Sequence, residues 1–249
     1  SISMKKTLIA LMAMASVASA ALTEIATYDS LVGGMTAVGS ITSSDEYDKP
    51  VYTFDSSAYI GGTNDAVVNA ITSSTGTVIF AAWVNLATDA SQYNTLVGWG
   101  ESGKGFKFGI KGDDLFYVTK NVKETVKDFS IAKGEWTLIT LQYKPSDKNV
   151  RLLATEVDGQ YYGVSDNATM NAVTTEQFSI GSANGNATSL DENFDGMISG
   201  FKVFTADNFV GNTEIAAAMG PAPVLIPEPA TATLSLLALA GLAARRRRK

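Results

Sequence analysis

The middle of the chain is a succession of short apolar segments separated by polar turn residues. Val, Ile, Phe, Tyr and Thr dominate the segments, whereas Gly, Asp, Asn and Ser dominate the gaps. This pattern is typical of β-strands joined by turns. Residues 106–111 (FKFGIK) show it most clearly, because apolar side chains occupy every second position and both lysines lie on the other face. The alternation predicts a strand with one buried face, which turns through 112–114 into a second strand at 115–119.

Further strands are predicted along the rest of this region, at residues 78–85, 95–99, 136–143, 150–157, 161–164, 178–181 and 197–204. Asp158-Gly159 is a hairpin-turn pair, and Asn212 and Gly220 are the expected N-cap and stop of a short helix over 213–219. Residues 21–49 are expected to give one edge strand and loops. So many short strands predict a single all-β, two-sheet antiparallel sandwich over residues 21–220, with a linker at 221–226.

The N-terminus has the arrangement of a secretory signal peptide. Lys5 and Lys6 precede the apolar stretch 8–15, and Ala18 and Ala20 form a small-x-small cleavage site. The apolar stretch is too short to cross a bilayer, which takes about 20 residues. Residues 1–20 are therefore interpreted as a signal peptide, and the exported protein is expected to begin near residue 21.

The C-terminus has the arrangement of a stop-transfer segment. The tripeptide Pro227-Glu228-Pro229 precedes an apolar run at 230–244, and a cluster of cations follows. The cluster consists of Arg245, Arg246, Arg247, Arg248 and Lys249. Such cations stay on the cytoplasmic side of a membrane. A helix made of the apolar run would reach only about 22 Å, short of a hydrocarbon core of about 30 Å. A transient sorting tail therefore fits better than an ordinary tail anchor, which remains the alternative.

These three parts, in this order, resemble a PEP-CTERM sorting signal over residues 227–249. The resemblance implies an exosortase-type processing enzyme as partner, transient membrane insertion through the C-terminal segment, and removal of the tail near Pro227-Glu228-Pro229. It also implies a location in the cell envelope, at the cell surface or in the extracellular matrix.

Charge and composition exclude several functions. The chain contains no histidine and no cysteine, so a Ser-His-Asp triad, a thiolate nucleophile and a His- or Cys-ligated metal are impossible. Residues 21–227 carry 24 acidic residues (all 25 except Glu228) against 12 basic ones, a net charge of −12. Such a surface repels phosphates, which argues against nucleic acid and against anionic sugars or lipids as main ligands. Neutral glycans, cations and other proteins remain open.

The order of aromatic and turn motifs adds a family resemblance. The motifs lie at residues 52–55 (YTFD), 80–84 (FAAWV), 134–139 (GEWTLI), 156–159 (EVDG), 178–181 (FSIG) and 194–204 (FDGMISGFKVF). Together they resemble the LamG-like, concanavalin A-like jelly-roll family over residues 51–209. The resemblance implies an all-β, two-sheet antiparallel jelly-roll sandwich, here flanked by an N-terminal signal helix and a C-terminal hydrophobic helix.

Catalysis is not favoured by the residues. Glycosidases of this superfamily carry E-x-D-x-x-E on one strand, so that a carboxylate pair about 5 Å apart can act on the glycosidic bond. The nearest match is Glu156-Val157-Asp158, but Tyr161 stands where the second glutamate belongs. No catalytic residue is assigned, and a glycoside hydrolase remains the alternative.

A calcium site is the one cofactor that the residues suggest. Ca²⁺ takes about six to eight oxygen ligands, and Asp191 and Asp195 lie in an oxygen-rich stretch before the last strand. LamG-like relatives carry an acidic pair within that strand, where this chain has Ser199 and Gly200. The acids at 113–114 are explained more simply as solvated turn residues.

Glycan binding requires exposed aromatic rings beside polar groups. Trp83 and Trp136 are expected in the core. Trp99 ends a strand beside a Gly-rich loop, and one ring of the pair Tyr161 and Tyr162 must point outward. These three are the expected binding residues. The sequence thus predicts an exported binding or structural module that binds a neutral glycan or a matrix protein, and a purely structural or adhesive matrix protein is a further alternative.

Overall fold

A computed structural model describes residues 21–28, 35–63, 65–72, 75–90, 92–99, 106–118, 125–127, 129–158, 161–167, 177–182 and 192–227. The expected signal helix, the apolar C-terminal segment with most of its sorting motif, and Asp191 lie outside these residues. Within them, no helix has the length and apolar character that crossing a membrane requires.

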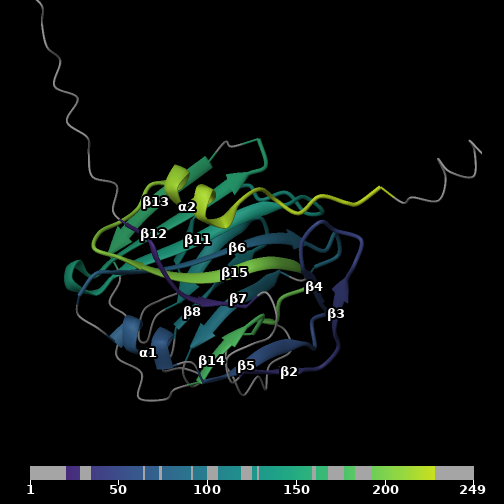
Figure 1. The fold of residues 1–249 in the computed structure, drawn as a ribbon, viewed down its shortest axis with the longest axis horizontal. Coiled ribbons are helices and arrows are strands. Elements are labelled where there is room, and N and C mark those ends of the chain that lie inside the picture. The colour runs from purple at the N-terminus through teal and green to yellow at the C-terminus, as the bar shows by residue number, and fades with distance from the viewer. Residues whose placement is uncertain are drawn as a thin grey trace, which may run out of the picture.

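Two antiparallel sheets face each other (Figure 1). The eight-stranded sheet runs in the order β13 (Tyr161–Asn167), β12 (Asn149–Glu156), β11 (Thr137–Lys144), β6 (Thr77–Leu86), β15 (Gly196–Ala206), β4 (Val51–Phe54) and β3 (Ile41–Ser44), with β1 (Thr23–Thr27) also paired to β15. The seven-stranded sheet runs in the order β10 (Thr125–Lys127), β9 (Asp114–Val118), β8 (Phe106–Lys111), β7 (Tyr93–Trp99), β14 (Gln177–Ile180), β5 (Tyr59–Thr63) and β2 (Met35–Val38). The predicted two-sheet jelly-roll sandwich is confirmed.

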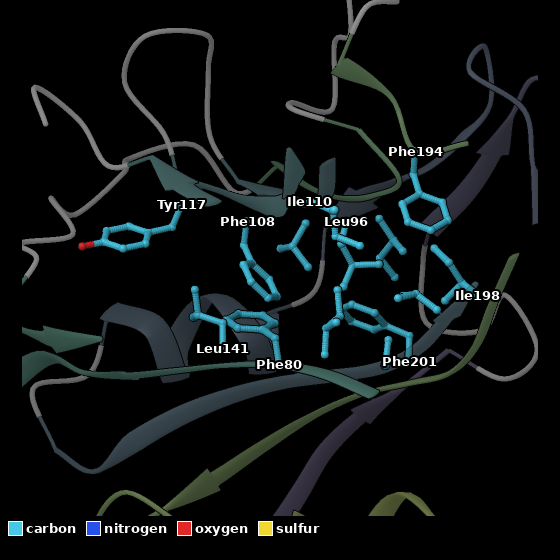
Figure 2. Packing of buried hydrophobic residues seen from close by; sticks show 14 of the residues in the cluster. Phe80, Leu96, Phe108, Ile110, Tyr117, Leu141, Phe194, Ile198 and Phe201 are labelled. Atoms are coloured by element: carbon cyan, nitrogen blue, oxygen red, sulfur yellow. The ribbon is translucent and has the colours of Figure 1, made fainter. Parts of the chain in front are cut away.

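The main core fills the space between the sheets. Figure 2 shows Phe80, Leu141 and Phe201 of the eight-stranded sheet pointing toward residues of the other sheet such as Leu96 and Phe108. The alternation predicted for β8 is seen in its described side chains, since Phe108 and Ile110 are buried and both lysines are partly exposed.

Phe178 of β14 connects the two sheets through its ring. Its centroid lies 6.1 Å from that of Phe80 and 6.3 Å from that of Phe201, both on the opposite sheet, and 6.0 Å from that of Tyr28. Aromatic rings at these separations contribute both buried area and favourable ring geometry.

A second, smaller core lies on the outer face of the eight-stranded sheet. Trp83 of β6 and Phe204 of β15 pack there with Ile215 and Met219 of helix α2 (Asn212–Met219). All ten residues of β6 are buried, because one face meets the other sheet and the opposite face meets α2. This explains why β6 reads as an unbroken apolar run instead of an alternating one.

β15 contains a β-bulge between Ser199 and Lys202. Ile198 before the bulge and Phe201 and Val203 after it all face the main core, so the inserted residue shifts the inward-facing positions from even to odd numbers. Gly200 takes a φ of +62° within the bulge, and the Ser199 hydroxyl donates to the Pro50 carbonyl at 2.8 Å. Ser199 and Gly200, which stand where LamG-like relatives are expected to carry an acidic pair, therefore form part of the bulge.

Residues 220–226, called the C-terminal strap below, are held against the domain, in contrast to the expected linker. The Ile226 N–H donates to the Glu46 carbonyl at 2.7 Å, and the Asp48 N–H donates to the Val224 carbonyl at 3.0 Å. The Lys49 ammonium donates to the Pro221 carbonyl. Figure 1 shows the strap continuing from α2 along the outer side of the sheet. The small residues and prolines of the strap did not predict these hydrogen bonds, because the partners lie in a loop far away in the sequence.

The helices differ from expectation in detail. α2 begins at Asn212 with Gly211 as N-cap, and the Asn212 side chain instead accepts a hydrogen bond from the Thr155 hydroxyl. Gly220 ends the helix with a φ of +69°, as predicted. Helix α1 (Asp65–Thr72) and the short 3₁₀ helix η1 (Pro145–Asp147) were not expected. α1 buries Val67 and Ile71, and two turns are too few to show a helical period.

Replacing Phe178 tests the contact between the sheets. Phe178→Ala should lower the free energy of unfolding by about 3–5 kcal/mol, because it removes a fully buried ring and leaves a cavity. Urea unfolding followed by tryptophan fluorescence measures the change. Val38→Ala, at a side chain that is 42% exposed, is the control and should cost no more than about 0.5 kcal/mol. Equal effects of the two substitutions would contradict this account of the core.

Candidate ligand-binding site

A concave pocket lies where β11 begins and β12 ends. It has a volume of about 210 Å³ and is lined by residues 129–132, 135–137, 154 and 156–158. Thr137 and Glu156 are directly paired across the two strands, so the residues just before β11 and just after β12 come together at one end of the sheet. We call this hollow the Trp136 pocket.

One wall of the pocket is the loop 129–135, which other segments hold in place. The Ile131 N–H donates to the Asp113 carbonyl at 2.7 Å, and the Phe129 N–H donates to a carboxylate oxygen of Asp114 at 3.0 Å. Phe129 and Ile131 are buried in the main core, and the exposed Ser130 between them has a φ of +56°. A non-glycine residue in this region is strained, and such strain is concentrated at ligand-binding and active sites.

Trp136 supplies the aromatic surface of the pocket. Its ring meets that of Tyr47 edge-to-face, with centroids 5.9 Å apart and an interplanar angle of 88°. The side chain is only half-buried, because the rest of it lines the pocket. By contrast, Trp83 is buried as predicted, and its indole N–H donates to the Gly220 carbonyl at 3.1 Å. Trp136, expected in the core, is thus divided between core and pocket.

The charged residues that line the pocket are all acidic. They are Glu135, Glu156 and Asp158, and no lysine or arginine lies among the lining residues that the structure describes. The nearby Lys133 is directed elsewhere, since its ammonium donates to the Ala90 carbonyl at 2.9 Å. Carboxylates around a half-exposed indole ring suit a ligand that carries hydroxyl groups or a positive charge, and they repel anions.

The structure contradicts the expectation that Trp99 binds a ligand. Trp99 is 1% exposed and belongs to the main core. It still lies within the sheet, paired with Phe106 on one side and Phe178 on the other. The adjacent Gly-rich loop suggested an exposed position, but the strand continues through Trp99 and points its side chain between the sheets.

Tyr161 and Tyr162 lie at the start of β13, the edge strand of the eight-stranded sheet, where they pair with Thr155 and Ala154. The direction of their rings lies outside what the structure describes. Their role as binding residues therefore stays a prediction. The residues that sequence reasoning missed are Glu135 and Trp136, and the available signal was a tryptophan beside a carboxylate directly before a strand.

Asp195, the described half of the expected calcium site, lies at the start of β15. Its half-buried carboxyl group has a raised pKa, because burial disfavours the charge and Asp89 and Asp55 add to this effect, with Lys133 opposing it. Its N–H donates to the side-chain oxygen of Asn94 at 3.2 Å. No group of three or more acidic side chains placed to hold a metal ion occurs in the described part of the chain.

Two buried polar side chains lie near Asp195. Asn193 is two residues before it in the sequence, and Thr95 follows Asn94, whose side chain accepts the hydrogen bond from the Asp195 N–H. Asn193 and Thr95 form a parallel backbone bridge, and they are 1% and 0% exposed. Neither the amide group of Asn193 nor the Thr95 hydroxyl has a hydrogen-bond partner. Their oxygen atoms are of the kind that Ca²⁺ takes as ligands.

A sequence-family profile described as the concanavalin A-like lectin/glucanases superfamily matches residues 56–207. The chain belongs to this superfamily. A search of the curated proteins finds no match.

Solved structures with the same fold include binding domains of botulinum neurotoxins. The receptor binding domain of the mosaic serotype C/D is 16% identical with a TM-score of 0.54, over 74% of this chain and 45% of that chain. The serotype D binding domain is 14% identical with a TM-score of 0.55, over 76% of this chain and 47% of that chain. The chain thus spans just under half of these structures, and at such low identity the likeness shows the fold alone.

Replacing Asp195 tests the cost of its charge. Because its pKa is raised above the ordinary 3.8 in the folded state, the charged form destabilises the fold above that pH, and the cost disappears in acid. Asp195→Asn should therefore raise the melting temperature near pH 7 by at most about 2–4 °C, since a half-buried charge is partly screened by solvent. Calorimetry in EDTA near pH 7 and near pH 3 measures the difference.

Asp207→Asn, at an exposed carboxylate, is the control and should not change the melting temperature. A decrease on replacing Asp195 in EDTA would contradict the proposed cost. If Asp195 helps to hold Ca²⁺, adding the ion should stabilise the unaltered protein and leave the Asn variant unchanged.

Proposed function

We propose that this protein is an exported, non-catalytic binding module, and that its Trp136 pocket holds a neutral or positively charged glycan. The observation that carries the proposal is the half-exposed Trp136 ring, set in a hollow whose described charged groups are all carboxylates. An indole face stacks on the apolar face of a sugar ring, and carboxylates accept hydrogen bonds from its hydroxyl groups.

Membership of a superfamily of lectins and glucanases supports a carbohydrate ligand. The incomplete E-x-D-x-x-E pattern at Glu156 favours binding over hydrolysis. A protein ligand from the matrix would use the same pocket.

Export and sorting form the second part of the proposal. We infer that residues 1–20 direct export and that an exosortase-type enzyme removes the tail near Pro227-Glu228-Pro229. The apolar run and its cationic end support this inference. The protein would then act in the cell envelope or extracellular matrix, where the acidic domain recognises ligands without attraction to phosphate-rich surfaces. A calcium ion near Asp195 is an additional proposal, and the unpartnered oxygens of Asn193 and Thr95 support it.

Replacing Trp136 tests the ligand. The domain of residues 21–227 should give saturable signals for some neutral or amine-bearing glycans on an array. Trp136→Ala should weaken binding by about 5- to 30-fold, because the loss of one stacking ring costs on the order of 1–2 kcal/mol. Glu135→Gln should selectively weaken the binding of glycans that carry a positive charge. Tyr93→Ala, at a half-buried ring of the seven-stranded sheet, is the matched control and should leave binding unchanged.

Binding that survives Trp136→Ala in a folded variant would contradict the proposed site. If no glycan on the array gave a binding signal, the structural or adhesive alternative would be favoured. Release of shorter sugars by the unaltered domain, lost in Glu135→Gln or Glu156→Gln, would favour a glycosidase.

The sorting motif is tested in cells that contain the processing enzyme. Pro227→Ala and Glu228→Ala should leave the full-length precursor in the membrane fraction, because the enzyme then lacks its recognition tripeptide. Immunoblotting of membrane and matrix fractions, with Val38→Ala on the opposite sheet as control, measures the precursor. Unchanged processing of both motif variants would contradict the sorting proposal.

A further inference from the structure

In the described part of the chain, four of the five strongly exposed large apolar side chains lie at or beside the C-terminal strap. Among the described residues, Val157, Val224, Leu225 and Ile226 are 65%, 60%, 59% and 50% exposed, and Val38 on the opposite sheet, at 42%, is the fifth of this kind. Clusters of this type mark contact surfaces for proteins or membranes, whereas single exposed apolar residues need no explanation. We call the four residues the strap patch.

The patch borders a groove on the outer face of the eight-stranded sheet. The groove has a volume of about 630 Å³, and Val157 and Val224 line it together with Trp83, Pro221, Pro223 and Ala217. Its walls are the end of β12, the last turn of α2 and the C-terminal strap. Apart from Glu156, none of the described residues that line it is charged.

The backbone of the strap is anchored by hydrogen bonds at Val224 and Ile226, which fixes the direction of the side chains there. The Val224 N–H donates to the Asp48 carboxylate at 2.8 Å, and the Val224 carbonyl and the Ile226 N–H are bonded to Asp48 and Glu46. Leu225 pairs with Tyr47 as an isolated β-bridge. A backbone held at three successive residues presents their side chains in a fixed arrangement, so the exposure is a property of the fold.

We infer that the strap patch and its groove rest on the surface of a neutral, zwitterionic bilayer while the precursor is held in the membrane. This inference rests on the proposed insertion of the C-terminal segment. Ile226 is followed by only three residues, 227–229, before the apolar run 230–244 begins. Three residues span at most about 11 Å, so an inserted run brings the bilayer surface within reach of the patch.

The charged residues around the strap patch favour a zwitterionic over an anionic bilayer as its contact. Glu46, Asp48, Glu156 and Asp158 lie around the strap patch, with Lys49 already bonded to the Pro221 carbonyl. This acidic rim would be repelled by anionic headgroups but not by zwitterionic ones. Apolar side chains within such a rim can enter the headgroup region to a depth of about 5–10 Å.

Single-cysteine labelling tests the inference, since the chain has no cysteine of its own. Full-length Val157→Cys and Val38→Cys are each labelled with an environment-sensitive fluorophore and reconstituted into phosphatidylcholine vesicles that contain a headgroup quencher. The label at 157 should be quenched roughly twofold or more compared with the label at 38, because only the first lies within about 5–10 Å of the headgroups. Replacing part of the phosphatidylcholine by phosphatidylglycerol should reduce this difference.

The outcomes separate this inference from the sorting proposal. Protein that stays in the vesicle pellet after alkaline extraction has its C-terminal segment inserted. If it does so but both labels are quenched equally, the membrane contact is overturned and the sorting proposal stands. If alkaline extraction releases the protein, both the membrane contact and the proposed insertion of the C-terminal segment are contradicted. A spectral change at 157 that depends on protein concentration without vesicles would assign the patch to a second copy of the chain and overturn the bilayer contact.

Discussion

The structure depends on the burial of the eight-stranded sheet on both of its faces. One face forms the main core with the seven-stranded sheet, and the other packs under α2 and the C-terminal strap. The buried Gln142 side chain holds the segment before α2 by exchanging two hydrogen bonds of 2.8 Å with the backbone of Val210. Because hydrophobic burial is the main stabilising force in folding, the short helix and strap are parts of the domain.

This double burial also places the two surfaces that we connect with function. At the point where β11 begins and β12 ends, the Trp136 ring meets that of Tyr47 edge-to-face and also lines the pocket. On the other side of Glu156 and Val157 lies the groove beside the strap. The two hollows share these residues, so a ligand in the Trp136 pocket would lie close to the face that we propose meets the membrane.

The acidity of the domain agrees with both roles. A protein kept outside the cytoplasm that carries an excess of carboxylates avoids unspecific attachment to phosphate-rich polymers. The same excess leaves stacking, hydrogen bonding to hydroxyl groups and attraction of cations as the means of recognition. The raised pKa of Asp195 shows first the cost of burying a carboxylate, to which the charges of Asp89 and Asp55 add.

Periodicity alone was enough to predict most of the strands and the two-sheet architecture. FKFGIK at residues 106–111 alternates as a half-buried strand does, and the apolar run of β6 is long enough to read as a strand buried on both faces. Helix α1 and the strands β1 to β5 and β10 were not recognised in full. They are short, and their positions depend on partners far away in the chain, as in the pairing of β1 with β15.

The amino-acid sequence by itself determined the fold class, the acidic surface and the absence of histidine and cysteine chemistry, because these follow from local pattern and composition. Only the tertiary structure decided which tryptophan is accessible. Trp99 and Trp136 each stand at the end of an apolar strand segment, yet Trp99 is enclosed between the sheets and Trp136 lines a pocket. The difference arises from which segments pack over each strand end, and packing between distant segments leaves no mark on the residues next to either tryptophan.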